Sequence, residues 1–526
     1  MLVRYDQNFR RAWMFPRNIR KIHPWKLVKI LTILDHLTDT KTWKGNQTLQ
    51  NSFINYLSDE QLKTDQNIRD PHSGGGRTYL AQLKSLGLVF EKDNMLFNTL
   101  AGEALISGDN PLTIIQKQLL KHQYPSSYSF GQNVKIHPAI KVKPFLFIID
   151  LLDDPEIKIL NCQELIFPII YGHNDSCLKL CKDKILEYRF SGNLYDVIDN
   201  PERDLYTPRI KNRSIQDRIN TFIDIANTLK NYLESSFLVK TLFINGVQNI
   251  CINEDFRTLI EDARHNQKYF IPHPENEESF LRNYGLWNRS KDTRNLKKDP
   301  PNLINNSKFI RQNFFLYCGE NLVIDDPNEF AGEMEISYGF TKNQIIDAIS
   351  DYLPKSQSLF EYEYLMLATG GQRTARKFEF ATGKIFKDML RFEVELTGQR
   401  HRKGRGGYSD IFLIALNRKD CAIVDTKATS QYTLSHEDIL KMSHTYIANY
   451  KELCDGRNLE LKFCSYVAGG FRENIETGLR DIHLLTKVPA SAITAKNLLD
   501  LSLELQTHNY NQDIVIDQFS QNKYLN

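Results

Sequence analysis

Hydrophobic residues recur at helical spacing through much of the first 270 residues. The pattern predicts amphipathic helices over 24–37 ("PWKLVKILTILDHL") and 77–89 ("RTYLAQLKSLGLV"). After the second helix, two short apolar runs flank a polar turn at 92–94, which predicts a two-stranded β-ribbon. Helices followed by such a ribbon are typical of a winged helix. We expect a winged-helix-like unit over about 22–135.

A similar order of elements follows in residues 136–270. Helical spacing recurs in 143–154 and 218–236, and a hairpin is expected in 237–253 with its turn at Asn245-Gly246. The next stretch, 271–340, is polar and rich in Asn, Arg, Lys and Pro, which indicates a linking segment or a nucleic-acid-contacting loop.

The pattern changes near residue 340, where a capped helix at 341–353 leads into a region of short apolar runs separated by helical segments. These runs have the length of buried strands: "IFLIAL" (411–416), "CAIV" (421–424), "LKFCSYVAGG" (461–470) and "ASAIT" (490–494). Strands flanked by helices predict an α/β sandwich over 341–526. The fold class is therefore multidomain, with a mainly α-helical, winged-helix-like region at 1–340 and an α/β domain after it.

Length and composition agree with this division. A chain of 526 residues with 41% hydrophobic and 25% charged residues is expected to form several globular domains. No run of eighteen apolar residues occurs, so we expect a cytoplasmic protein without a membrane segment.

The net charge of +3 is uninformative, but basic residues gather in two places near the N-terminus. The first thirty residues interleave cations with aromatic residues, as an arm lying along a phosphate backbone would; an ordinary solvated basic face explains this pattern equally well. Arg77 follows three glycines and precedes the second helix, where backbone N–H groups could bind phosphate; a plain surface loop is the alternative. The candidate DNA-contacting residues here are Arg10, Arg11, Arg17, Arg20, Lys21 and Arg77.

The chemistry of the C-terminal domain centres on the hairpin within 406–427. A four-residue turn pairs Leu416 with Cys421, which places Asp410 opposite Lys427 and puts Asp425 on the same face. Two carboxylates and an ammonium group at the end of apolar strands are unfavourable unless they are paired or hold a metal. A hard cation such as Mg²⁺ relieves the repulsion and accepts phosphate oxygens. Charged strand ends are common, so the motif alone also fits a surface hairpin.

The surroundings favour the metal-site interpretation. The run "GQRHRKGRGGYSD" leads into Asp410 and brings Arg402, Lys403 and Arg405 to where a polyanion would approach. An upstream helix carries Glu379, a further possible carboxylate or an ordinary solvent-facing one.

The order of motifs after residue 356 resembles the cleavage domain of FokI-like type IIS restriction endonucleases, which belong to the PD-(D/E)xK nucleases. The resemblance rests on "EYEYLMLA", "SDIF", "AIVDTKA", "FCSYVAGGF" and "SAITAKNLL". "GGGRTYLAQLKSLGLVF", "LTIIQKQLLKHQYPS" and "VKPFLFIIDLL" are similar to the recognition region of AlwI-like enzymes.

This resemblance implies a set of roles. Asp410 and Asp425 would bind Mg²⁺, which Mn²⁺ can replace, with the carbonyl of Thr426 as a further ligand. Lys427 would be the catalytic lysine, and Glu379 would match the helix glutamate. Ser409 stands where the family has proline. The family further implies double-stranded DNA as substrate, cleavage outside a short asymmetric site, transient homodimerisation of the cleavage domain and a companion DNA methyltransferase.

Two other functions compete with a site-specific double-strand endonuclease. One is a DNA-binding regulator whose C-terminal domain is an inactive nuclease, although the complete Asp, Asp-x-Lys set argues against such decay. The other is a nickase or structure-specific nuclease, which sequence cannot separate from an enzyme that cuts both strands.

Overall fold

The computed structural model describes most of the chain, namely residues 9–16, 26–38, 41–59, 74–130, 134–206, 212–244, 246–266, 269–296, 306–321, 327–398, 401–402, 405–472, 475–507 and 511–525. It divides into two compact units, Met1–Gln312 and Asn313–Asn526. This division falls N-terminal to the domain boundary predicted near residue 340. The predicted boundary stays a prediction. None of the described helices has the length and apolar character needed to cross a membrane.

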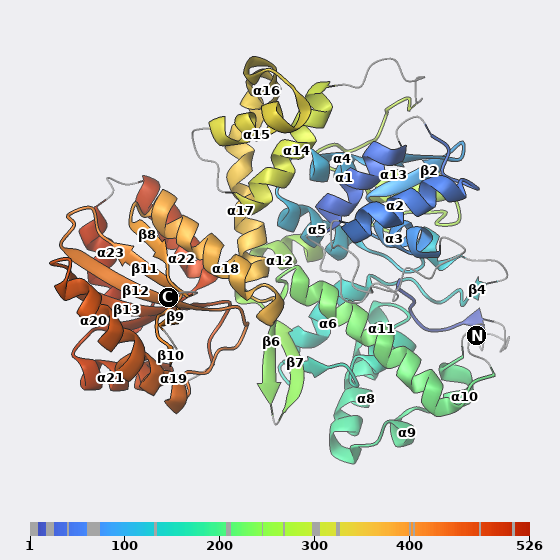
Figure 1. The fold of residues 1–526 in the computed structure, drawn as a ribbon. Helices are drawn as coiled ribbons and strands as arrows, with labels where there is room; N and C mark the ends of the chain where they lie inside the picture. The colour runs from blue at the N-terminus through green and yellow to red at the C-terminus, as the bar shows by residue number, and fades with distance from the viewer. Residues whose placement is uncertain are drawn as a thin grey trace. The chain divides into compact units, whose positions relative to one another are not determined.

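The first unit contains the helices and the ribbon expected from the sequence, with one further helix, Gln47–Asp59, between the two expected helices (Figure 1). Its elements are α1 (Leu27–Thr38), α2 (Gln47–Asp59), α3 (Gly74–Ser85), β2 (Val89–Lys92) and β3 (Met95–Asn98). β2 and β3 pair antiparallel. Asp93 and Asn94 both have positive φ, the conformation that a two-residue hairpin turn requires.

The remainder of this unit is also mainly helical. The principal helices are α4 (Leu100–Ile106), α5 (Pro111–Lys121), α6 (Pro144–Asp153), α8 (Leu178–Ser191) and α11 (Ile215–Ser235). The predicted hairpin is present as β6 (Val239–Ile244) and β7 (Val247–Ile252), with β5 (Leu160–Asn161) on the other side of β7. Gly246 takes φ +79° in the turn, whereas Asn245 lies outside the described residues. Two short strands, β1 (Phe9–Arg10) and β4 (Lys135–Ile136), pair in parallel.

The segment 271–340 contains more regular structure than its polar composition indicated. It includes the helices α13 (Glu277–Tyr284), α14 (Asn306–Glu320) and α15 (Asn328–Tyr338). Phe280, Leu281 and Tyr284 are buried against Phe90 and Phe97 of the ribbon. The interpretation of 277–284 as part of a linker is therefore wrong, because three apolar residues in a short polar helix suffice to dock it on an aromatic core.

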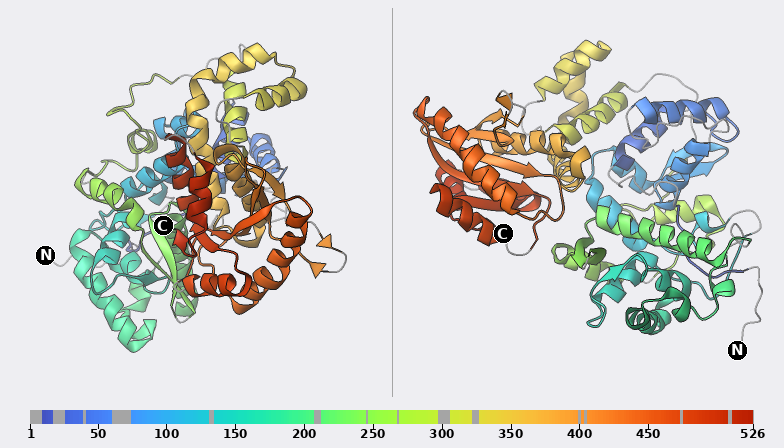
Figure 2. Two further views of the ribbon diagram at one scale, coloured as in Figure 1. Left: turned by 90° about the vertical axis from the view of Figure 1, so that its left-hand side faces the viewer. Right: turned by 60° about the horizontal axis from the view of Figure 1, so that its bottom comes forward.

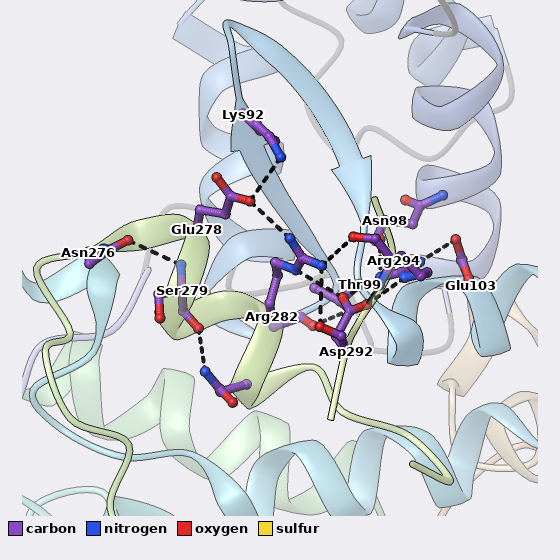
Figure 3. Close-up of polar contacts among 12 residues, drawn as sticks. Lys92, Asn98, Thr99, Glu103, Asn276, Glu278, Ser279, Arg282, Asp292 and Arg294 are labelled. Carbon is purple, nitrogen blue, oxygen red and sulfur yellow. Dashed lines mark hydrogen bonds and ion pairs between the residues drawn. The ribbon is translucent and has the colours of Figure 1, made fainter. Parts of the chain in front are cut away.

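An ion-pair network holds the chain after α13 in place (Figure 3). Asp292 accepts hydrogen bonds from the guanidinium groups of Arg282, at 3.1 Å, and Arg294, at 2.8 and 2.9 Å. Arg294 also donates to the carbonyl of Asn98 at the end of β3 and pairs with Glu103. Burial raises the pKa of Asp292, but the two arginines outweigh it and lower the pKa overall. The network fastens this segment to the ribbon.

The second unit is built on one mixed six-stranded sheet of order β15-β14-β13-β12-β11-β8. The strands are β8 (Glu393–Leu396), β11 (Ile411–Ile414), β12 (Asp420–Lys427), β13 (Glu460–Ala468), β14 (Ala490–Thr494) and β15 (Tyr524–Leu525). β8, β11 and β12 pair antiparallel, whereas β12 to β15 run parallel. The predicted α/β architecture is confirmed. Figure 2, left, shows two further short strands, β9 (His401–Arg402) and β10 (Arg405–Gly406), set apart from the sheet.

Helices cover both faces of this sheet. One core joins the sheet to α17 (Leu353–Leu367), α18 (Ala375–Lys384), α22 (Ala495–Thr507) and α23 (Gln512–Phe519). The opposite core joins it to α19 (His436–Leu440), α20 (Ile447–Asp455) and α21 (Ile475–Thr486). Val424 packs into the first core and its neighbour Ile423 into the second, as alternation along a strand requires. The predicted capped helix is also present as α16 (Lys342–Ile349), where Thr341 and Gln344 form a capping box.

Candidate active site

The β11–β12 hairpin is paired in a register two residues away from the predicted one. Cys421 pairs with Ile414, whereas Leu416 was the expected partner. The side chain of Asn417 accepts hydrogen bonds from the N–H groups of Lys419 and Asp420, and Arg418 takes φ +53°. This local turn brings Asp420 into the strand, so that the N–H of Ala415 donates to its carbonyl.

The error in register leaves the predicted face unchanged, because side chains alternate with a period of two and the shift is even. Phe412 and Ile423 are paired and lie in the same core. Asp410 precedes Phe412 by two positions, and Asp425 follows Ile423 by two. The specific pairing of Asp410 with Lys427 is wrong, but the structure does bring the charged residues to one end of the hairpin.

Asp425 and Lys427 form a largely buried ion pair at this end. Lys427 Nζ lies 2.7 Å from Asp425 Oδ2. Asp425 is only 3% exposed, whereas the side chain of Lys427 retains 25% exposure. The ammonium group also lies 5.6 Å from the centroid of the Tyr432 ring. The carboxylate is thus fixed inside while the cation reaches the surface of the site.

Asp410 is held by contacts to both its backbone and its carboxylate. Oδ2 accepts hydrogen bonds from the N–H and Oγ1 of Thr426, each at 2.7 Å. The carbonyl of Asp410 accepts from the N–H groups of Thr397, at 2.7 Å, and Gly398, at 3.1 Å, just after β8. These contacts leave Oδ1 as the carboxylate oxygen directed away from Thr426.

Glu379, on α18, faces the same space. A Cβ at Gly398 would lie 3.1 Å from Glu379 Oε1 and 3.1 Å from Asp410 Oδ1. The two carboxylate oxygens are therefore separated by no more than twice this distance. Because Gly398 has no side chain, the space between them stays open.

The crowding of carboxylates changes their titration. Burial and the charge of Asp410 raise the pKa of Asp425 to about 6, against the opposing effect of Lys427. Burial and Asp410 also raise the pKa of Glu379 to about 7. Burial lowers the pKa of Lys427, but Asp425 and Asp410 outweigh it and raise the pKa overall. The site therefore favours a bound cation and keeps Lys427 protonated.

The donor set suits a hard divalent cation that retains water ligands. Among the residues that the structure describes, no three His, Cys, Asp or Glu side chains converge closely enough to hold one ion directly. The converging donors are the carboxylates of Asp410 and Asp425, and Mg²⁺ is commonly held by one or two carboxylates plus substrate oxygens and water.

Several residues that position this site were missed by sequence reasoning. Thr397 Oγ1 donates to the carbonyl of Ser409 at 2.8 Å and hydrogen-bonds the hydroxyl of Tyr450. The Tyr450 ring stacks on Phe412 with centroids 5.0 Å apart. Ser409, which replaces the usual proline, is fully buried within these contacts. No local signal in the hairpin points to Thr397 or Tyr450, because both come from other elements.

The candidate DNA-contacting residues fall into four groups. Arg10 is buried and donates to the carbonyl of Ser129, so it does not belong to an exposed basic surface. Arg11 is half-buried and Arg77 is exposed on α3. Arg402 and Arg405 pair through their backbones in β9 and β10. Arg17, Arg20, Lys21 and Lys403 lie outside the described residues.

Comparison with known proteins decides the class of this site. Residues 339–526 match the family model of the FokI cleavage domain. This segment is a FokI-type cleavage domain, so the chain carries the nuclease domain of a restriction endonuclease. A nuclease domain of this family implies a divalent metal cofactor. Asp410, Asp425 and Lys427 all lie within the matched FokI-type segment.

Whole-chain comparisons add no weight to this assignment. The structure of FokI bound to DNA is 13% identical, with 96% of this chain and 97% of that chain covered and a TM-score of 0.30. FokI alone gives 13% identity, 100% coverage of both chains and a TM-score of 0.29. The BpuJ1 endonuclease binding domain in complex with modified DNA gives 14% identity, 53% and 98% coverage and a TM-score of 0.35. No curated protein matches the chain significantly.

The raised pKa of Glu379 leads to a testable effect on the stability of the FokI-type domain. A carboxyl whose pKa is higher in the folded than in the unfolded state destabilises the fold once ionised, so stability falls as pH rises from about 4.5 to 7. In EDTA at pH 8.5, Glu379→Gln is expected to raise the free energy of unfolding by about 1 kcal/mol, a rise in Tm of about 2–4 °C. The gain should shrink as the pH is lowered to 5.

Thermal unfolding at the two pH values checks this expectation. Glu335→Gln is the matched control, because Glu335 is an exposed helical glutamate with no ion pair among the described residues. An equal change in both variants, or a gain that persists at pH 5, would refute the assigned cause.

Proposed function

We propose that this endonuclease cuts both strands of duplex DNA outside a short asymmetric recognition site, using Mg²⁺. The observation that carries the proposal is the joint placement of Asp410, Asp425 and Lys427 at the end of the β11–β12 hairpin, with Asp425 paired to Lys427 at 2.7 Å. The chemistry that fits this set is phosphodiester hydrolysis with a metal-activated water.

Asp410 and Asp425 would hold the Mg²⁺, with the carbonyl of Thr426 as an additional ligand and Mn²⁺ as a substitute. A bound cation of this kind lowers the pKa of a coordinated water and offsets charge on the scissile phosphate. Thr426 fixes one oxygen of Asp410 through its N–H and hydroxyl, which limits the rotation of that carboxylate. Burial of Asp425 keeps competing water away from the ion pair.

Lys427 would act as a fixed positive charge beside the reacting phosphate. Its raised pKa means that the free protein presents an ammonium group, which can donate hydrogen bonds to the attacking water and to a phosphate oxygen. Asp425 sets its position, so the two residues form one functional unit. Glu379 would act from outside this pair, as a group that orients water or cation.

Recognition would lie in the N-terminal region, 1–340. α1, α2, α3 and the β2–β3 ribbon occur in the order of a winged helix, which supports α3 as the helix that enters the major groove. Arg77 is exposed on α3, where it can reach phosphate. Arg11, Arg17, Arg20 and Lys21 are the proposed backbone contacts of the N-terminal arm, and Arg402, Lys403 and Arg405 those near the cleavage site.

Cleavage of both strands would use a transient homodimer of the cleavage domain, and a companion DNA methyltransferase would protect the host site in the cytoplasm. These proposals follow from the resemblance to FokI-like enzymes and not from a contact within one chain.

Digestion of supercoiled plasmids with the purified protein tests the function. We expect linear fragments with ends at a fixed offset in 10 mM Mg²⁺ or Mn²⁺, mapped by run-off sequencing, and no cleavage in excess EDTA. Nicked circles alone would identify a nickase. Intact plasmid in every sequence context and with either metal would favour the regulator and contradict the proposal.

A further inference from the structure

Four lysines of the N-terminal unit lie close together although they come from two segments. Lys117 and Lys121 are four positions apart on α5 and so share one face of that helix. Lys141 and Lys143 immediately precede α6. Burial, together with the charges of Lys117 and Lys143, lowers the pKa of Lys121 to about 7. We call these four residues the lysine row.

Two aromatic rings border the lysine row. Lys117 Nζ lies 4.9 Å from the centroid of the Trp287 ring. Lys141 and Lys143 place their ammonium groups 5.0 and 5.5 Å from the centroid of one ring, that of Phe270. Both ammonium groups therefore lie beside the same ring. Cation–π contacts fix such side chains without neutralising them.

Carboxylates are scarce around the row. Within the described part of the chain, Lys117, Lys121 and Lys141 form no ion pair with Asp or Glu. Lys121 donates instead to the carbonyls of Tyr284 and Leu286, both at 3.0 Å. Asp109 accepts a hydrogen bond from the indole of Trp287, whereas the charge of Asp175 acts on Lys143.

Gathered like charges destabilise the free protein and are relieved by a polyanion. Burial lowers the pKa of Lys143 to about 8, and an adjacent anion would stabilise its charged form. An anion that spans the row would neutralise several ammonium groups at once. This repulsion in the free state indicates a ligand surface and not a fold-stabilising cluster.

We propose that the lysine row binds the sugar-phosphate backbone of the duplex recognised by the N-terminal unit. The inference rests on the proposed function, which supplies duplex DNA as the partner. Lysine binds phosphate as a point charge and lacks the planar guanidinium group with which arginine makes paired hydrogen bonds. The row would therefore position the DNA without reading its sequence.

A surface for an acidic protein would use the same charges, but the observations favour DNA. The chain carries a nuclease domain, so its substrate is itself the polyanion at hand. Lys117 and Lys141 are exposed and are not fixed by acidic neighbours, which suits a partner with regularly repeated charges.

Salt-dependent DNA binding of the full-length protein tests the row. The double variant Lys117→Gln/Lys141→Gln removes two exposed charges without disturbing buried Lys143. In EDTA, its affinity for a duplex of mixed sequence should fall at least 10-fold in 150 mM salt. The slope of log K against log[salt] should decrease by about 2, because each phosphate contact contributes about 0.9. The ratio of affinities for specific and unrelated duplexes should not change.

The matched control is Lys179→Gln/Lys342→Gln, which also removes two exposed lysines that have no ion pair among the described residues. It should keep the wild-type slope. An unchanged slope in the lysine-row variant, or an equal decrease in the control, overturns the proposal. Loss of binding to polyglutamate together with an unchanged DNA slope assigns the row to an acidic protein and also overturns it.

The same proteins separate this inference from the proposed function. If the wild-type protein cuts plasmid and the lysine-row variant keeps the full salt slope, the nuclease proposal stands and the proposed role of the lysine row is refuted. If the wild-type protein never cuts and the lysine-row variant loses DNA binding, the nuclease proposal is refuted and DNA binding by the lysine row is supported.

Discussion

Lys427→Ala is expected to reduce the rate of DNA cleavage by about 10³-fold or more at saturating enzyme. A fixed donor that stabilises charge in the transition state contributes about 10²–10³ in rate, and general acid–base assistance adds about 10²–10⁴. DNA affinity in EDTA should fall less than 10-fold, because the lysine is one of many cations that face the duplex. Single-turnover cleavage and filter binding measure the two effects separately.

Two companion variants decide how Lys427 acts. Lys427→Arg preserves the charge but replaces the compact ammonium by a planar group, so it should restore binding and only part of the rate. Lys462→Ala is the matched control, since Lys462 lies on the adjacent strand β13 and pairs with Asp420 and Glu460 away from the site. Equal loss of cleavage and binding in folded Lys427→Ala would contradict the assigned role. Because the alanine variant leaves Asp425 buried without its partner, its Tm must be measured first.

The convergence of Asp410, Asp425 and Lys427 could be predicted from sequence because strand alternation is insensitive to an even error in register. The turn could not be placed correctly, since its position depends on the side chain of Asn417 capping the N–H groups of Lys419 and Asp420. A slip of one residue would have moved the charged set to the opposite face. The prediction of the site therefore needed only a register error of an even number of residues, and did not need the exact cross-strand partners.

The N-terminal unit shows where composition misleads. The polar segment after residue 271 was interpreted as a linker, yet α13 buries Phe280 and Tyr284 against the ribbon. Arg10 was grouped with exposed cations, but it is buried beside Ser129. In both cases a few long-range contacts override the local average, and a single sequence does not record which segments will meet.

The residues that hold the site in place could not be predicted from the sequence either. Gly398 lies against Asp410 and Glu379, and Thr397 joins Ser409 to Tyr450, because β8 and α20 pack beside the hairpin. The lysine row likewise needs α5 and the start of α6 to lie beside Phe270 and Trp287. Motif spacing identifies groups within one hairpin, whereas these partners depend on the packing of elements far apart in the chain.

Asp425→Asn is expected to lower cleavage by at least about 10³-fold while leaving DNA binding in EDTA equal or tighter. The substitution keeps the shape of the side chain but removes one of the two converging carboxylates, so the site should lose its affinity for the divalent ion. It also removes a negative charge that opposes the phosphate. Asp420→Asn, on the same strand but paired with Lys462, should cleave within about 2-fold of wild type.

Thermal unfolding with and without Mg²⁺ distinguishes a metal ligand from a residue that only holds Lys427. A ligand that binds the folded state alone raises its stability by RT ln(1 + [L]/Kd), so wild type should gain Tm with Mg²⁺ and Asp425→Asn should not. A variant that loses cleavage but keeps the full metal-dependent gain would restrict Asp425 to positioning Lys427 through their 2.7 Å contact. If the two residues act as one unit, the double variant Asp425→Asn/Lys427→Ala should cleave no more slowly than the less active of the two single variants. Additive losses would instead mean that cation binding and the ammonium group contribute independently to the transition state.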